Sequence, residues 1–265
     1  MSAGQSLLAV AIGFISSVLS GLFGIGGGVV TTPAIRLLLG QSELIAVGTP
    51  LPVILPTAIS GAISYYRRGL MDLRAGVTLG AWGAVASVAG ALATQAVGGP
   101  FLMYVTAGVI SYMSIDMVLL AFRRPAASPE LVVLPAEPHK SVRNRRLSLA
   151  ALGLITGLYS GFLGLGGGFI VVPALVRWFG FDIKRAIGTS LVVVTILSIP
   201  GSITHTLLGH VDLGLAALLA IGVIPGALIG AKITSVAKER FVKLAFAALL
   251  LFVGLSLALA QAGVL

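Results

Sequence analysis

A glycine-rich stretch that occurs twice is the part of this sequence whose residue types and spacing best fit a chemical task. The first copy covers residues 20–34 and the second covers residues 160–174, 140 residues later with no gap. Eight of the fifteen aligned positions are identical, and five of these identities are glycines, which allow backbone shapes that other residues resist. If a helix breaks at the glycines, the helix that follows presents free N–H groups and a positive dipole end, which favour an anion.

The main-chain N–H groups after each triple glycine are therefore the predicted anion ligands. These glycines are Gly26, Gly27 and Gly28 in the first copy and Gly166, Gly167 and Gly168 in the second. Nearby hydroxyls complete the predicted substrate site: Thr31, Thr49, Thr189 and Ser190. We expect the hydroxyls of Thr49 and Thr189 to help hold the anion, because both belong to a repeated Gly-Thr pair at the start of an apolar segment. The plainer alternative for any of these hydroxyls is a bond back to its own helix.

The glycines themselves have two other interpretations. A nucleotide-binding glycine loop requires a preceding strand and a soluble α/β unit, and the apolar flanks argue against both. Close packing between helices is the stronger alternative, since small residues let helices approach one another in bilayers. The anion-binding interpretation instead places irregular backbone at membrane depth, which is tolerated where it is buried in protein or lines a cavity.

Few ionisable residues fall within the apolar segments. Arg36 and Arg177 lie near segment ends, where we expect their charged heads to reach the interface. Asp116 is either interfacial or a carboxylate that couples transport to protons. His205 matches Tyr65 in the other copy and is expected at the interface, although histidine titrates near neutral pH. No paired carboxylates, metal-ligand cluster or nucleophile–base set stands out, so we predict no catalytic residue, no metal, no cofactor and no enzymatic activity.

The composition indicates the environment in which this site must be held. Of the 265 residues, 57% are hydrophobic and only 9% are charged, against about 25% charged in an average soluble domain. The mean hydropathy is +1.09. These values predict an all-α, multi-pass protein of the cell (inner) membrane, surrounded by the lipid bilayer. The net charge of +9 would suggest nucleic acid in a soluble protein, but here the basic residues lie between apolar runs and indicate cytoplasmic loops, with no nucleic-acid partner.

Ten apolar segments form two units of five. Residues 1–121 make the first repeat, residues 122–146 a polar linker and residues 147–265 the second repeat. The predicted segments are 6–23, 26–40, 45–66, 73–96 and 101–121, then 147–165, 167–181, 186–207, 211–233 and 241–261. The segments 26–40 and 167–181 begin at the triple glycines and are short of the roughly 20 residues of a full crossing. They are either short tilted spans or arms of re-entrant hairpins. The first apolar run lacks a basic n-region before it and is expected to be retained, not cleaved as a signal peptide.

The positions of the basic residues predict that the two units have opposite orientations. In the first unit Arg67, Arg68 and Arg74 follow the third segment, whereas in the second unit the basic residues flank the third segment on its other side and follow the fourth. Placing basic loops inside puts the linker in the cytoplasm and both termini outside. Inverted repeats with a binding site at their interface recur in secondary transporters.

The paired motifs also resemble a known family. The pattern G-x-G-G-G-x-x-x-x-P-A at residues 24–34 and 164–174, each copy followed by A-x-G-T, is similar to that of the sulfite exporter TauE/SafE family of membrane permeases. The resemblance covers nearly the whole chain, and its specificity lies in the duplication. It implies export or uptake of small sulfur-containing anions such as sulfite, sulfoacetate or another organosulfonate.

A secondary transporter for such an anion is therefore the leading prediction. A passive anion channel and a non-transporting membrane scaffold are the alternatives, because helix ends also serve a channel and glycines also serve packing. The sequence leaves open the particular anion, the direction of transport, coupling to protons or another ion, and the oligomeric state.

Overall fold

The computed structural model describes residues 3–94, 99–122 and 142–261, and the regular structure in these ranges is entirely helical. The first half contains α1 (Ala3–Phe23), α2 (Gly28–Leu38), α3 (Glu43–Gly48), α4 (Pro50–Arg67), α5 (Leu73–Ala93) and α6 (Gly99–Phe122). The second half contains α7 (Val142–Leu163), α8 (Gly168–Phe179), α9 (Ile183–Leu207), α10 (Leu213–Ala220), α11 (Val223–Val236) and α12 (Glu239–Gln261). The predicted all-α class is confirmed. Most of the predicted linker, residues 123–141, lies outside the described residues, as do the two chain ends.

The helices that follow the triple glycines are short, as the sequence predicts. Helix α2 has 11 residues and α8 has 12. At about 1.5 Å per residue each is roughly 17–18 Å long, well short of a hydrocarbon core of about 30 Å. Neither helix spans a bilayer alone, and both begin inside the bundle.

Two predicted segments are interrupted in the structure. Segment 45–66 contains α3 and α4, which together form one apolar span over residues 43–67. Thr49 between them keeps helical backbone angles, and only the hydrogen-bond ladder is broken at Pro50, which has no N–H. Segment 211–233 is split into α10 and α11, which are bent by 47°. Pro225 has no N–H to donate to the carbonyl of Ile221, so the helix cannot continue regularly through this point. The matching position in the unbroken α5 is Val85.

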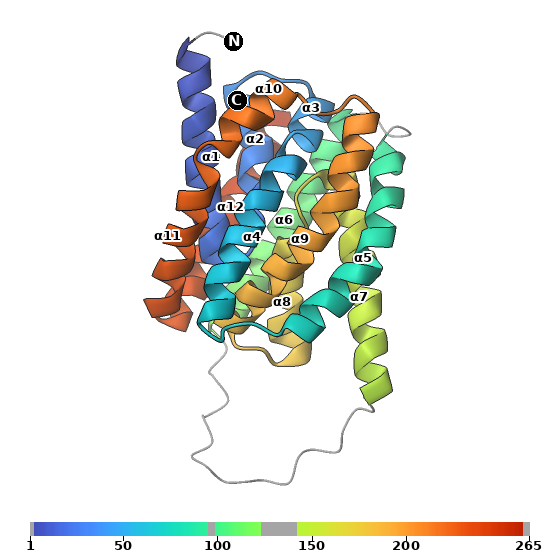
Figure 1. Ribbon diagram of the computed structural model, residues 1–265, viewed down its shortest axis with the longest axis vertical. Helices are drawn as coiled ribbons and strands as arrows, with labels where there is room; N and C mark the ends of the chain where they lie inside the picture. The colour runs from blue at the N-terminus through green and yellow to red at the C-terminus, as the bar shows by residue number, and fades with distance from the viewer. Residues whose placement is uncertain (1–2, 95–98, 123–141, 262–265) are drawn as a thin grey trace.

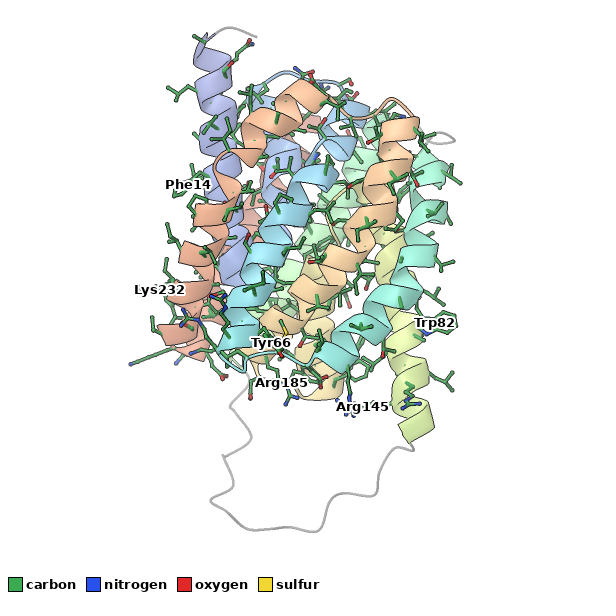
Figure 2. The ribbon with its side chains drawn as sticks, viewed as in Figure 1. Phe14, Tyr66, Trp82, Arg145, Arg185 and Lys232 are labelled. Atoms are coloured by element: carbon green, nitrogen blue, oxygen red, sulfur yellow. The ribbon has the colours of Figure 1, made fainter. Side chains whose placement is uncertain are left out.

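The outer surface is that of a multi-pass membrane protein. Among the described residues, five helices are long and apolar enough to cross a bilayer, and the bent pair α10–α11 makes a sixth if it is one span. Large apolar side chains such as Phe14 and Trp82 project from the sides of the bundle (Figure 2), and residue Trp82 is 52% exposed. The apolar atoms of these side chains cannot form hydrogen bonds with water, so their exposure on the outer surface fits contact with lipid.

Helices of the first half pack mainly against helices of the second half. Helix α1 packs against α10 and α11 of the second half, and α7 packs against α5 of the first. Helices α4 and α9 pack on each other between these pairs, and α6 packs on α12. The α5–α7 contact is close enough that a Cβ on Gly157 would lie 2.0 Å from the carbonyl oxygen of Gly83. In Figure 1, α1 begins at the top of the view and runs downward, whereas α7 begins at the bottom and runs upward.

Candidate anion-binding site

The breaks before α2 and α8 are built from glycines in the left-handed region of backbone space. We call residues 24–28 the first elbow and residues 164–168 the second elbow. In the first elbow φ is +70° at Gly24, +78° at Gly26 and +90° at Gly27, values that residues with a Cβ rarely adopt. The corresponding glycines of the second elbow have φ values of 66°, 75° and 73°. The predicted helix break is therefore present in both copies.

In the described part of the chain, each elbow leaves main-chain donors without a partner at the start of a helix. Gly27 caps α2, and its carbonyl accepts hydrogen bonds from the N–H groups of Val30 and Thr31, both at 3.0 Å. The hydroxyl of Thr31 donates to the same carbonyl at 3.0 Å. The N–H groups of Gly28 and Val29 come too early in the helix to have an intrahelical partner, and the positive end of the helix dipole lies at the same place. The second elbow has the same main-chain arrangement at the start of α8.

The two elbows lie directly against one another. A Cβ on Gly28 would lie 2.8 Å from the carbonyl oxygen of Gly164, and a Cβ on Gly168 would lie 2.1 Å from that of Gly24. At Gly28 and Gly168 glycine therefore serves close packing, whereas at the positions with positive φ it serves the backbone turn. The two halves thus bring their triple glycines together, 140 residues apart in the sequence.

Helices α4 and α9 enclose the elbows. A Cβ on Gly26 would lie 2.6 Å from Val194 of α9 and 3.2 Å from Ile54 of α4. Ser190 of α9 donates its hydroxyl to the carbonyl of Gly24 at 2.8 Å, so this predicted site residue does contact an elbow. All ten elbow residues are buried and none carries a charged side chain. The site is an enclosed, neutral region rich in main-chain donors.

Serines that the sequence analysis did not select lie beside the elbows. The Cβ of Ser20 is 3.8 Å from where a Cβ on Gly27 would be, and that of Ser160 is 3.3 Å from the equivalent point on Gly167. The hydroxyls of Ser20, Ser160 and Thr156 are buried without a hydrogen-bond partner in the described part of the chain. One signal could have found the two serines, because they are identical residues at matching positions just before each helix break.

Thr49 and Thr189 have partners in the opposite half. The hydroxyl oxygen of Thr49 accepts a hydrogen bond from the N–H of Asp212 at 3.1 Å, and that of Thr189 accepts one from the N–H of Asp72 at 2.9 Å. Both threonines are fully buried. Each threonine therefore anchors a turn of the other half: Thr49 holds the turn before α10, and Thr189 holds the turn before α5. The prediction that these hydroxyls contact an anion stays a prediction, and it now competes with this structural role.

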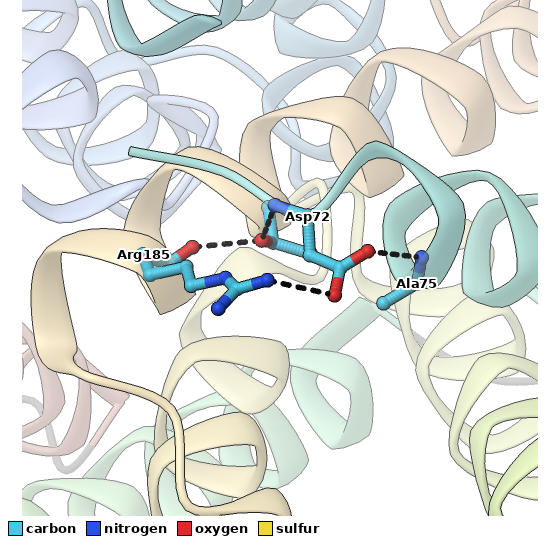
Figure 3. A network of polar contacts seen from close by, with 4 residues as sticks. Asp72, Ala75 and Arg185 are labelled. Carbon is cyan, nitrogen blue, oxygen red and sulfur yellow. Dashed lines mark hydrogen bonds and ion pairs between the residues drawn. The ribbon is translucent and has the colours of Figure 1, made fainter. Parts of the chain in front are cut away.

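The turn held by Thr189 carries a further polar network, shown in Figure 3. Asp72 accepts a hydrogen bond from the N–H of Ala75 at 3.0 Å and thereby caps α5. Its other carboxylate oxygen is 3.2 Å from a guanidinium nitrogen of Arg185, which lies in the first turn of α9. Since the Arg185 side chain is 50% exposed, the ion pair contributes little stability, and the cap contributes more.

The arginines of the apolar segments are paired rather than free. Arg36 forms an ion pair with Glu43 at 2.5 Å, and Arg177 of α8 forms one with Asp116 of α6. The two arginine side chains are 34% and 37% exposed, and their expected position at the interface stays a prediction. Asp116, which the sequence leaves as interfacial or proton-coupling, thus joins the second short helix to α6.

His205 takes the structural place of Tyr65. The Tyr65 hydroxyl donates to the carbonyl of Gly21 at 2.9 Å, and Nε2 of His205 lies 2.8 Å from the carbonyl of Gly161, the matching residue. Because a carbonyl only accepts, this contact places the proton on Nε2. Nδ1 of His205 then accepts from Nδ1 of His210, 3.2 Å away. His205 is fully buried in the last turn of α9, and its expected position at the membrane interface stays a prediction.

Comparison with known proteins identifies the family that the duplicated glycine motif resembles. The family model described as sulfite exporter TauE/SafE matches residues 9–257. The chain belongs to the TauE/SafE family. A relative from Bacillus subtilis, "Probable membrane transporter protein YdhB", is 27% identical over 89% of this chain and 94% of its own. A second relative, "Probable membrane transporter protein YunE" from the same organism, is 26% identical over 86% of each chain.

A relative from Xylella fastidiosa, "Probable membrane transporter protein", is 28% identical over 79% of this chain and 77% of its own. No solved structure matches the chain. The matching TauE/SafE segment includes both elbows and every helix that surrounds them. The chain is therefore a membrane transporter of the TauE/SafE family.

Proposed function

We propose that the protein is a secondary transporter for a small sulfur-containing anion, such as sulfite, sulfoacetate or another organosulfonate, and that it has no enzymatic activity. The observation that carries the proposal is the meeting of two helix N-termini at the elbows. Free N–H groups and two positive dipole ends favour an anion there without a buried cation. The description of the matching family as sulfite exporters supports sulfur as the central atom.

The proposed ligands are the main-chain N–H groups at and just after the triple glycines Gly26–Gly28 and Gly166–Gly168, with Thr31, Thr49, Thr189 and Ser190 as neighbouring hydroxyls. Of these, Ser190 and Thr31 contact the elbow carbonyls of Gly24 and Gly27. They therefore fix the shape of the first elbow, whatever direct contact they make with the substrate.

The same proposal includes an inverted repeat. It is supported by the opposite directions of α1 and α7 in Figure 1. It is also supported by packing between the halves, because α1 packs on α10 and α11 while α7 packs on α5. Arg145, Arg185 and Lys232 all lie toward the end of the bundle where α6 ends and α7 begins (Figure 2). Basic residues concentrate on the cytoplasmic side, so we place this end, and the linker, in the cytoplasm.

The main alternative is a passive channel. The burial of all ten elbow residues favours a transporter, because an open channel exposes its binding site to water on both sides at once. Proteoliposomes with and without an imposed proton gradient separate the two. Gradient-driven accumulation of the anion identifies a coupled transporter, whereas equilibration alone identifies a channel.

A ligand screen tests the substrate class. Purified protein is heated with sulfite, sulfate, sulfoacetate, taurine or chloride, because a ligand that binds only the folded state raises the unfolding temperature. We expect at least one sulfur oxyanion to raise it and chloride to have no effect. A protein stabilised by none of the sulfur compounds would contradict the proposed substrate class.

A further inference from the structure

Two buried serines have hydrogen-bonding capacity that the fold does not use. Ser20 and Ser160 lie in the last turns of α1 and α7, and they are 0% and 1% exposed. Their hydroxyls find no hydrogen-bond partner among the described residues. Their main-chain carbonyls, in contrast, accept bonds from the first glycine of each elbow, at 2.7 and 3.0 Å.

Several buried hydroxyls of the neighbouring helices α4 and α9 are satisfied within their own helix, although those of Thr32 and Ser202 also lack a partner among the described residues. Ser198 donates to the carbonyl of Val194 at 2.7 Å, and Thr57 donates to that of Val53 at 2.8 Å, each one turn earlier in its own helix. This back-bonding is the usual way for a helical hydroxyl to be satisfied in an apolar setting. A buried hydroxyl without a partner is unfavourable, so its presence at the same position of both halves calls for a ligand.

The surroundings of the two serines show what that ligand must offer. Both serines lie beside the caps of α2 and α8, where the first N–H groups have no partner among the described residues and can only donate. The carbonyl of Gly27 already accepts three hydrogen bonds, all at 3.0 Å. Thr156 adds a third unpartnered hydroxyl one turn before Ser160. The elbows thus offer donors, and the capping carbonyl of the first elbow accepts three hydrogen bonds, whereas that of the second accepts two.

We propose that Ser20 and Ser160 are side-chain ligands of the transported anion and that the elbows select an anion whose oxygens only accept hydrogen bonds, as in a sulfonate. The assignment rests on the proposed function and deepens it. A sulfonate group carries no O–H at neutral pH, so its three oxygens match a set of donors. Hydrogen phosphate would bury an O–H beside carbonyls that already accept two or three hydrogen bonds, and a site of this kind rejects such a mismatch strongly.

The test compares Ser20→Ala and Ser160→Ala with the control Ser198→Ala, a buried serine whose hydroxyl is bonded to its own helix. Affinity of the purified full-length proteins for sulfoacetate and for inorganic phosphate is measured by calorimetry, and the unfolding temperature is measured without ligand. We expect each elbow variant to bind sulfoacetate roughly tenfold more weakly, the effect of one charge-assisted hydrogen bond. Its ligand-free unfolding temperature should be unchanged or higher, since no bond of the fold is lost.

The control should show the reverse, with normal affinity and a lower unfolding temperature. Wild-type protein should bind sulfoacetate at least about tenfold more tightly than phosphate. Normal sulfoacetate affinity in both elbow variants would overturn the assignment and leave the proposed function standing. Failure of either alanine variant to fold would also overturn it, by showing that the fold needs the hydroxyl. Equal binding of phosphate would overturn the selectivity, and a wild type that binds no sulfur anion would overturn the proposed function itself.

Discussion

Replacing Thr49 and Thr189 by valine separates a structural role from a ligand role. Valine keeps the shape of the side chain and deletes the hydroxyl oxygen that accepts from Asp212 at 3.1 Å or from Asp72 at 2.9 Å. A typical hydrogen bond contributes about 1 kcal/mol net, and a buried N–H left unpaired costs about 1–3 kcal/mol. We expect each variant to lose roughly 1–2 kcal/mol of unfolding free energy. That corresponds to roughly 2–8 °C in unfolding temperature at about 2–4 °C per kcal/mol.

The two losses should be nearly additive, because Thr49 and Thr189 contact different turns at opposite ends of the bundle. Thr57→Val is the matched control, since its hydroxyl bonds only to the carbonyl of Val53 in its own helix. The assay is thermal unfolding in detergent, combined with sulfoacetate titration. If the threonine variants keep wild-type stability and lose anion affinity about tenfold, the structural reasoning is refuted and both hydroxyls are ligands.

Three further predictions concern packing, pH and charge. Gly168→Ala should destabilise the protein by about 3 kcal/mol, because its Cβ would lie 2.1 Å from the carbonyl of Gly24, whereas Gly108→Ala, with open space, should be neutral or stabilising in the same unfolding assay. Burial lowers the pKa of His210 below its usual 6.5, so the unfolded chain binds more protons in that window and stability should fall between about pH 7 and pH 5; His210→Gln should flatten this dependence in melts over the same range. Asp116→Asn should lower stability by roughly 1–2 kcal/mol by leaving its arginine unpaired, and unchanged melting would show that the ion pair contributes nothing.

Much of the fold could be predicted from local signals in the sequence. Hydropathy marks the segments, and the triple glycines mark where α2 and α8 begin, because a glycine with positive φ is a local requirement of the backbone. The apolar pattern does not predict the bend between α10 and α11, because residues 213–231 form one uncharged run. The repeat also suggested one span, because Val85 matches Pro225 in the unbroken α5. The available signal is Pro225 itself, a proline inside an apolar segment at a position where the other copy has Val85.

The polar contacts of the site were less predictable, because they join residues that are distant in the sequence. The partner of Thr49 lies 163 residues away, and only the exchanged packing of the two halves brings the pair together. Likewise, nothing in the sequence distinguishes the unpartnered hydroxyl of Ser20 from the back-bonded hydroxyl of Ser198. Which buried hydroxyl is satisfied depends on rotamers and neighbours that a single sequence does not specify.

Uptake of radiolabelled sulfoacetate or sulfite into proteoliposomes tests the central claim most directly, with wild-type protein compared with Gly27→Leu and Gly167→Leu. Both variants place a large side chain on a residue with φ of 90° or 73° at the cap of a short helix. The account predicts saturable uptake by the wild type and none by either leucine variant, with both variants still inserted in the membrane. Normal uptake by a well-inserted Gly27→Leu protein would contradict the claim that the elbows bind the transported anion.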